Sequence, residues 1–480
     1  MRDGERLEVV VVATPSPYPV VSVLFWSALG VAGWLLDWQN PVYGHGLAIT
    51  FLSLSAGAFG LWIFWRDGGT RRLTAVGIYG LSFAVFVGVS GLYIVRVWDV
   101  ATESMLFAIL LCYAIQVAVF AIFWHKPPPF LGPLVPSADA PSVTRWGIFA
   151  GSVILAIGLL AARTGLALGG LVDASVFSGA VLLAVSVFRR ETGGRSAVGL
   201  VTASAVFLLY AIYVFRGFGR LTLVALGFAL ALAAAQRIRA GLIKVGILAA
   251  ATPVLLILSR LRVEFTASLN PNQTLDVTGF ESVASPLLRF SQLIDLVQGG
   301  FLHLKLGETF FSSAVALFPR ALWPSKPVGL GAELAAIFRP DAIGTGQSEF
   351  ALFHGEWLYN FGIVGLAVTV PVVGLAAGAL NNWLVRASDR PLNSRAHLIG
   401  LVAAIVAASG LPDLLWGGTD TYVARAGERL VVLLMVSILF VGPLKPRTRG
   451  QGLAIQGTKP FSVGAARVVP RNATRESPPG

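Results

Sequence analysis

Long apolar runs constrain the fold of this chain more than any other feature. Twelve runs approach the roughly 20 apolar residues that a helix needs to cross a bilayer core of about 30 Å. Only 12% of the 480 residues are charged, whereas soluble globular domains carry about 25%. This composition excludes a water-soluble enzyme and predicts an all-α polytopic membrane protein with about 12 transmembrane helices. The runs are residues 20–36, 46–65, 73–95, 105–124, 146–162, 171–188, 197–215, 221–235, 240–259, 357–380, 396–411 and 430–444.

The distribution of charge predicts the orientation of these helices. If both termini lie inside, the inner segments hold most of the Lys and Arg, and the outer segments hold most of the Asp and Glu. Cytoplasmic loops concentrate Lys and Arg, so the pattern predicts an N-in, C-in topology in which the net charge of +12 comes from the inner side. Because topology explains the basic excess, we expect no nucleic-acid partner.

The runs divide the chain into four parts. Residues 1–259 carry helices one to nine, residues 260–356 form a large extracytoplasmic loop, residues 357–444 carry helices ten to twelve, and residues 445–480 form a disordered cytoplasmic tail. A loop this long is either functional or disordered. Apolar residues at helical spacing over 283–304 predict an amphipathic helix, and 309–318 predicts a short interfacial one. We therefore place the catalytic function in this loop. The runs show no inverted pair of interrupted helices such as transporters have.

Two segments of the loop carry candidate chemistry. In Phe318-Pro-Arg-Ala-Leu-Trp-Pro-Ser-Lys-Pro327, three prolines restrict the backbone around Arg320 and Lys326, which could bind a lipid phosphate or diphosphate. The alternative is that both cations simply reach from an apolar surface to the interface.

The second segment, residues 344–362, leads into the tenth helix and carries His354, Glu356, Tyr359 and Asn360. Glu356, Tyr359 and Asn360 share one helix face, where Glu356 could act as a general base or could pair with the N-terminal helix dipole. His354 is more typical of a packed or solvated histidine. No second histidine lies at ligand spacing, so we expect no metal site and no cofactor.

Further arginines lie in the outer segments. Arg216 and Arg220 flank a short outer loop, where the positive-inside rule does not place cations, so they are functional candidates. Asp420 is expected to pair with one of two nearby arginines. The arginines that could line the same outer cavity are Arg289, Arg425 and Arg429.

Together these residues resemble a family, the bacterial O-antigen and oligosaccharide repeat-unit polymerases. The resemblance covers about residues 213–374 and depends mainly on Pro319-Arg-Ala-Leu-Trp-Pro-Ser-Lys-Pro327 and on Gly355-Glu-Trp-Leu-Tyr-Asn-Phe-Gly362 followed by Gly365. The match to the family's final-helix pattern at Gly418-Thr-Asp420 is approximate.

The resemblance implies a GT-C-type membrane glycosyltransferase at the outer face of the bacterial plasma membrane. Such an enzyme moves a growing glycan from undecaprenyl diphosphate onto a lipid-linked repeat unit. Its implied partners are polyprenyl-diphosphate-linked oligosaccharides, membrane lipids and a chain-length regulator. Glu356, or less favourably His354, would deprotonate the acceptor, while Tyr359 and Asn360 would orient the sugar. The cations implied to hold the diphosphates and stabilise the leaving group are Arg216, Arg220, Arg289, Arg320 and Lys326.

Two alternatives remain open at this point. An O-antigen ligase also has about twelve helices and a cationic outer loop, but it transfers the finished chain to a lipid core. A lipid-linked oligosaccharide flippase or another transporter would need polar residues at mid-membrane depth, and the apolar runs contain few of them.

Overall fold

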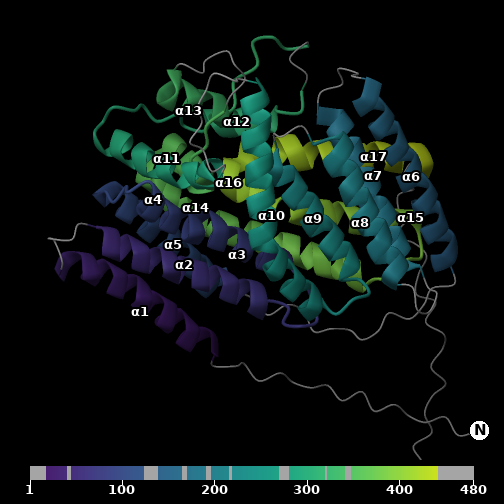
Figure 1. Cartoon of the computed structure of the whole chain (residues 1–480), viewed down its shortest axis with the longest axis horizontal. Coiled ribbons are helices and arrows are strands. Elements are labelled where there is room, and N and C mark those ends of the chain that lie inside the picture. Colours follow the sequence, from purple (N-terminus) through teal and green to yellow (C-terminus); the bar gives the residue numbers. More distant parts are fainter. Residues whose placement is uncertain are drawn as a thin grey trace, which may run out of the picture. The chain divides into compact units, whose positions relative to one another are not determined.

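The chain folds into helices. The computed structural model describes residues 18–39, 45–123, 139–164, 170–190, 196–215, 219–269, 280–318, 322–340 and 348–441, and every regular element in these ranges is helical (Figure 1). They belong to one unit, Met1–Val441. Arg216, Arg320 and the tail predicted over 445–480 lie outside the described residues.

The helices follow one another along the chain with short connections between most of them. They are α1 (Tyr18–Gln39), α2 (Gly46–Arg66), α3 (Ala75–Phe83), the π-helix η2 (Ala84–Val89), α4 (Ser90–Val97), α5 (Glu103–Phe123), α6 (Ala140–Thr164), α7 (Gly170–Arg189), α8 (Ser196–Tyr213), α9 (Arg220–Ala234), α10 (Ala240–Leu269), α11 (Glu281–Gln298), α12 (Glu308–Ala314), α13 (Leu330–Phe338), α14 (Leu352–Asp389), α15 (Arg395–Ser409), α16 (Leu411–Tyr422), the π-helix η4 (Val423–Gly427) and α17 (Glu428–Val441).

Every predicted apolar run contains a helix, but the count of twelve spans is not confirmed. Among the described residues, eight helices are long and apolar enough to cross a membrane, or nine if one bent pair forms a single span. That pair joins α15 to the segment Leu411–Phe440 across a bend of 81°. α9 and the Ala240–Ala251 part of α10 qualify only as shorter apolar helices. The N-in, C-in orientation stays a prediction.

The predicted outer loop is helical over much of its described length. α11 covers most of the amphipathic stretch predicted over 283–304, and Gly299 follows its last residue. α12 has only seven residues and is shorter than the helix predicted over 309–318. α10 continues to Leu269 and α14 begins at Leu352, so both helices extend into the predicted loop 260–356. α11, α12 and α13 pack against α14 or α16 (Figure 1).

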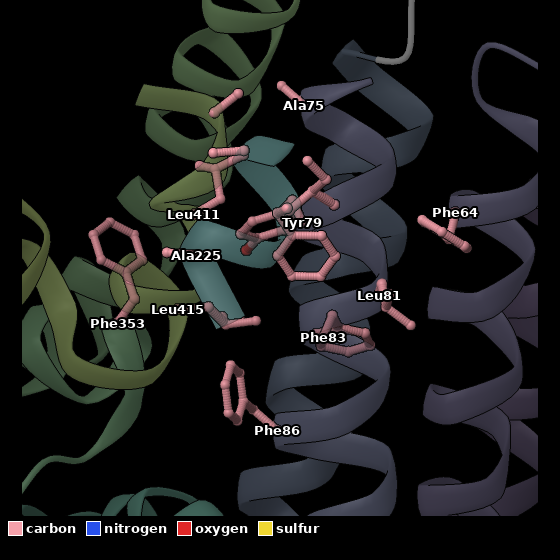
Figure 2. Close-up of a cluster of buried hydrophobic side chains, with 14 of the residues drawn as sticks. Phe64, Ala75, Tyr79, Leu81, Phe83, Phe86, Ala225, Phe353, Leu411 and Leu415 are labelled. Carbon is pink, nitrogen blue, oxygen red and sulfur yellow. The ribbon is translucent and has the colours of Figure 1, made fainter. Parts of the chain in front are cut away.

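The core beneath these helices is formed by apolar side chains from distant parts of the chain. Figure 2 shows Tyr79 and Phe83 of α3 close to Leu411 and Leu415 of α16, with Ala225 of α9 beside them. All five are at most 5% exposed. The packing of α16 on α3 and α9 therefore fixes where α16 lies, and α16 carries part of the candidate site.

Small residues allow α2 and α3 to approach closely. A Cβ added at Gly60 would lie 2.4 Å from the carbonyl oxygen of Gly80, a distance that no side chain tolerates. Close backbone contact through small residues is a common way for membrane helices to associate. These two glycines thus set the distance between α2 and α3.

Two helices are interrupted, which the apolar pattern did not predict. α14 breaks at Gly362 (φ 65°, ψ −152°) and α16 breaks at Gly418 (φ 76°, ψ −169°). Both glycines adopt a conformation that is essentially restricted to glycine. Hydropathy does not register the break in α14, because a single glycine inside the apolar run 357–380 leaves that run apolar, and Gly418 falls between two predicted runs. Each break releases backbone groups from helical hydrogen bonding, and these groups form the centre of the candidate site.

Candidate functional site

The candidate site centres on Glu356, a fully buried residue in the first part of α14. Its Oε2 accepts a hydrogen bond from the backbone N–H of Thr419 at 2.6 Å, and its Oε1 accepts one from Thr309 Oγ1 at 3.3 Å. Thr419 directly follows the break at Gly418, so its N–H is one of the groups released there. Glu356 therefore pairs with the helix that begins after the break in α16, and not with the N-terminus of its own helix. The alternative that Glu356 pairs with the N-terminal dipole of its own helix is therefore wrong.

Asn360, one turn after Glu356, connects the break in α14 to the segment before α12. Because the helix is interrupted at Gly362, the carbonyl of Asn360 is free to accept the N–H of Leu306 at 2.9 Å. Its Oδ1 accepts the N–H of Gly307 at 2.9 Å, and its Nδ2 donates to Thr309 Oγ1 at 2.6 Å. We call Thr309, Glu356, Asn360 and Thr419 the helix-break cluster. The loop segment thus satisfies backbone groups that the break leaves open.

Tyr359 lies beside this cluster with different partners. Its hydroxyl donates to Glu333 Oε2 of α13 at 2.7 Å, and Lys305 forms an ion pair with the same carboxylate at 3.2 Å. Burial lowers the pKa of Lys305, but hydrogen bonds and charges from Glu333 and Glu308 raise it more, so the pKa lies above its usual value. Helical spacing predicts Tyr359 on one face with Glu356, yet the structure directs it toward α13.

Lys326 and Asp420 lie near one another beside the cluster. Lys326 Nζ donates to the carbonyls of Ala316 at 2.7 Å and Phe318 at 3.0 Å, so the lysine fixes its own proline-rich segment. Asp420 is partly buried and lies within electrostatic range of both Lys326 and Glu356. A Cβ at Gly329 would lie 2.3 Å from Asp420 Oδ2, so the carboxylate contacts the backbone of the same segment. The site therefore holds two neighbouring carboxylates and one ammonium group.

The expected pairing of Asp420 with Arg425 or Arg429 is wrong. Arg425 forms an ion pair with the fully buried Asp413 of α16 instead. Asp413 lies in the part of α16 before the break at Gly418, whereas Asp420 lies beyond the break. Arg425 therefore stabilises the first half of α16 and does not contribute its charge to the helix-break cluster.

Arg429 lies apart from the cluster, against α7. Its side chain is fully buried, and its guanidinium carbon is 3.8 Å from the centre of the Phe177 ring. Among the described residues, its guanidinium nitrogens have no hydrogen-bond partner. Such a cation–π contact partly offsets the burial of the charge.

Arg289 and Arg220 are engaged in the fold around the site. Arg289 Nε donates to Glu349 Oε2 at 3.1 Å, and its guanidinium lies 5.0 Å from the centre of the Phe338 ring of α13. Arg220 begins α9 and donates to the hydroxyl of Ser282 at the start of α11. Both arginines therefore join α11 to neighbouring parts of the fold. Arg216 and Arg320 lie outside the described residues, so their relation to the cluster stays a prediction.

His354 is packed, which is one of the two environments expected for it. It is fully buried, and its Nδ1 lies 3.8 Å from Sγ of Cys112 on α5. Within the described ranges, no group of three or more His, Cys, Asp or Glu side chains could hold a metal ion.

Three residues of the site, Thr309, Thr419 and Glu333, were not predicted from the sequence. They lie 47, 63 and 26 positions from their partners Glu356 and Tyr359, so no local spacing connects them. The available signal was the pair Gly417-Gly418 before a threonine, because two adjacent glycines indicate an interruption of a helix.

Comparison of the chain with protein-family models, with curated proteins and with solved structures finds no match.

Proposed function

We propose that this chain is a membrane glycosyltransferase that lengthens a polysaccharide from lipid-diphosphate-linked repeat units at the extracytoplasmic face of the plasma membrane. The observation that supports the proposal is the convergence of two carboxylates, an ammonium group and an amide at the helix breaks: Glu356, Asp420, Lys326 and Asn360. Three of these four belong to the segments that resemble repeat-unit polymerases.

Glycosyl transfer to a hydroxyl needs a base for the acceptor and positive charge for the leaving diphosphate. In the proposed reaction, Glu356 takes the proton of the acceptor hydroxyl, while Lys326 stabilises the departing diphosphate. Asp420 is only partly buried and lies within electrostatic range of both. We assign Arg216, Arg220, Arg289 and Arg320 to the same diphosphate region as part of the proposal.

The test is deletion of the gene followed by complementation and gel analysis of surface polysaccharide. A ladder that collapses to one repeat supports the polymerase, polymer that stays unattached indicates the ligase, and lipid-linked units that accumulate inside indicate a flippase. Complementation with Glu356→Gln should leave single repeats, because the amide cannot accept the proton. Glu308→Gln is the matched control, since Glu308 is an exposed carboxylate of the neighbouring α12. A full ladder from a stably expressed Glu356→Gln chain would remove Glu356 as the base.

One observation favours transport as a second candidate. Interrupted helices with a buried carboxylate at the break are typical of ion-coupled transporters, and Gly362 and Gly418 interrupt two contacting helices. The flippase result of the same gel experiment would support this candidate.

A further inference from the structure

A cavity of about 320 Å³ lies far from the helix-break cluster. Its walls come from α2, α3, α5 and the second half of α14, where Val373 is the first lining residue. Val373 follows the break at Gly362 by roughly 17 Å of helix, at a rise of 1.5 Å per residue. The cavity is therefore separate from the site proposed above, and its ligand need not be the sugar donor or acceptor.

The cavity is mostly apolar but carries one polar group without a partner. Asn381 of α14 is only 5% exposed, and within the described residues its Oδ1 has no hydrogen-bond partner. The other buried amide, that of Gln116, already donates to the Tyr79 hydroxyl at 2.6 Å. A buried acceptor without a partner is unfavourable, so the cavity favours a ligand that brings a hydrogen-bond donor.

The cavity borders an exposed apolar part of α14, which is long and apolar enough to cross a membrane, and a cation lies close by. Leu375 lines the cavity and is also 63% exposed. Phe120, another lining residue, contacts the Trp62 ring at 5.1 Å between ring centres. The exposed Arg66 lies 5.6 Å from the centre of that same indole. An apolar space, an acceptor and an exposed cation therefore occur together at one end of α2.

We propose that this cavity binds one anionic phospholipid with a hydroxylated headgroup, such as phosphatidylglycerol. One acyl chain fills the apolar space, a headgroup hydroxyl donates to Asn381 Oδ1, and the phosphate lies near Arg66. A polyprenyl chain would fill the apolar space but would offer Asn381 no donor. A zwitterionic choline lipid has no headgroup donor either, so both make useful comparisons.

The test is native mass spectrometry of the full chain, delipidated in detergent and then mixed with phosphatidylglycerol or phosphatidylcholine. We expect one phosphatidylglycerol to stay bound at a collision energy that removes phosphatidylcholine. Gly378→Leu should abolish this retention, because Gly378 lines the cavity and a Cβ there meets no atom within 4 Å. Gly400→Leu is the matched control, since Gly400 lies in α15 with equally open surroundings.

Two more variants test the headgroup contacts. Asn381→Leu and Arg66→Gln should each reduce the preference for phosphatidylglycerol over phosphatidylcholine. Equal retention by the Gly378 and Gly400 variants would overturn the proposal, and so would equal retention of the two lipids. Preferential retention of undecaprenyl phosphate, offered as a third lipid in the same experiment, would overturn it too. If Gly378→Leu does not fold, the melting temperature of the unmodified chain decides, since phosphatidylglycerol must raise it more than phosphatidylcholine does. None of these measurements depends on glycosyl transfer, so the lipid site and the proposed function can fail separately.

Discussion

The two helix breaks allow a matched pair of substitutions that isolates the role of Glu356. Gly362→Ala and Gly418→Ala both place a side chain in a backbone conformation that is essentially restricted to glycine, which costs about 1–3 kcal/mol each. They differ in their surroundings. At Gly362 the nearest atom to a new Cβ is Leu304 Cδ1 at 3.5 Å, an ordinary contact, but at Gly418 it is Glu356 Oε2 at 2.6 Å.

The alanine at position 418 must therefore displace the Glu356 carboxylate. That displacement breaks the hydrogen bond from the Thr419 N–H to a charged group, a contact worth about 1.5–3 kcal/mol. We expect Gly418→Ala to lower the free energy of unfolding by about 1.5–3 kcal/mol more than Gly362→Ala does. Only the substitution at Gly418 should also disturb the proposed activity.

The assay is unfolding in mixed detergent micelles with increasing SDS, monitored by tryptophan fluorescence. Gly400→Ala serves as the control, because it lies in a regular helix with open space and should stabilise the chain by about 0.5–1 kcal/mol. Equal destabilisation by the two substitutions at the breaks would refute the reasoning, since it would mean that the contact with Glu356 contributes nothing to stability.

Two further substitutions test contacts around the site by the same unfolding assay. Arg425→Ala leaves the buried Asp413 carboxylate without its counter-charge, so we expect the free energy of unfolding to fall by about 3–5 kcal/mol. Adding Asp413→Asn to the same chain should restore part of this loss, and no restoration would show that the ion pair is not the cause. Asn360→Ala leaves the Gly307 N–H without its acceptor, so we expect the free energy of unfolding to fall by about 1–3 kcal/mol and proteolysis between α11 and α12 to become faster. Unchanged proteolysis would argue against this contact as the anchor of that segment.

The positions of most helices could be predicted from the sequence, because apolar length reports directly on burial in a membrane. The run at 46–65 and α2 (Gly46–Arg66) agree almost residue for residue. The helix start predicted from the run at 357–380 is wrong, since α14 begins at Leu352. A hydropathy scan stops at His354 and Glu356 because they are polar, although both are fully buried by tertiary contacts. Boundaries set by such contacts are invisible to a local pattern.

The candidate site was predictable only in part, for a related reason. Sequence spacing correctly grouped Glu356 with Asn360, since residues four apart meet on a helix, and Asn360 Nδ2 donates to the Glu356 carbonyl at 2.7 Å. The same spacing also grouped Tyr359 with them, but the Tyr359 hydroxyl donates its hydrogen bond to Glu333 of α13 instead. Which of three neighbouring side chains faces the cluster depends on the helices packed around α14.

The two oxygens of Glu356 are not equally available to a substrate. The contact with the Thr419 N–H is short at 2.6 Å and holds the break in α16, whereas the contact with Thr309 Oγ1 is 3.3 Å long. In the proposed reaction, the acceptor hydroxyl therefore replaces Thr309 at Oε1 while Thr419 stays in place. Thr309→Val removes the competing hydroxyl at nearly the same volume, together with the acceptor of Asn360 Nδ2, so we expect a loss of about 1–3 kcal/mol of stability with the polysaccharide ladder retained. Loss of the ladder, as expected for Glu356→Gln, would show that the Thr309 hydroxyl takes part in the reaction and would contradict the replacement.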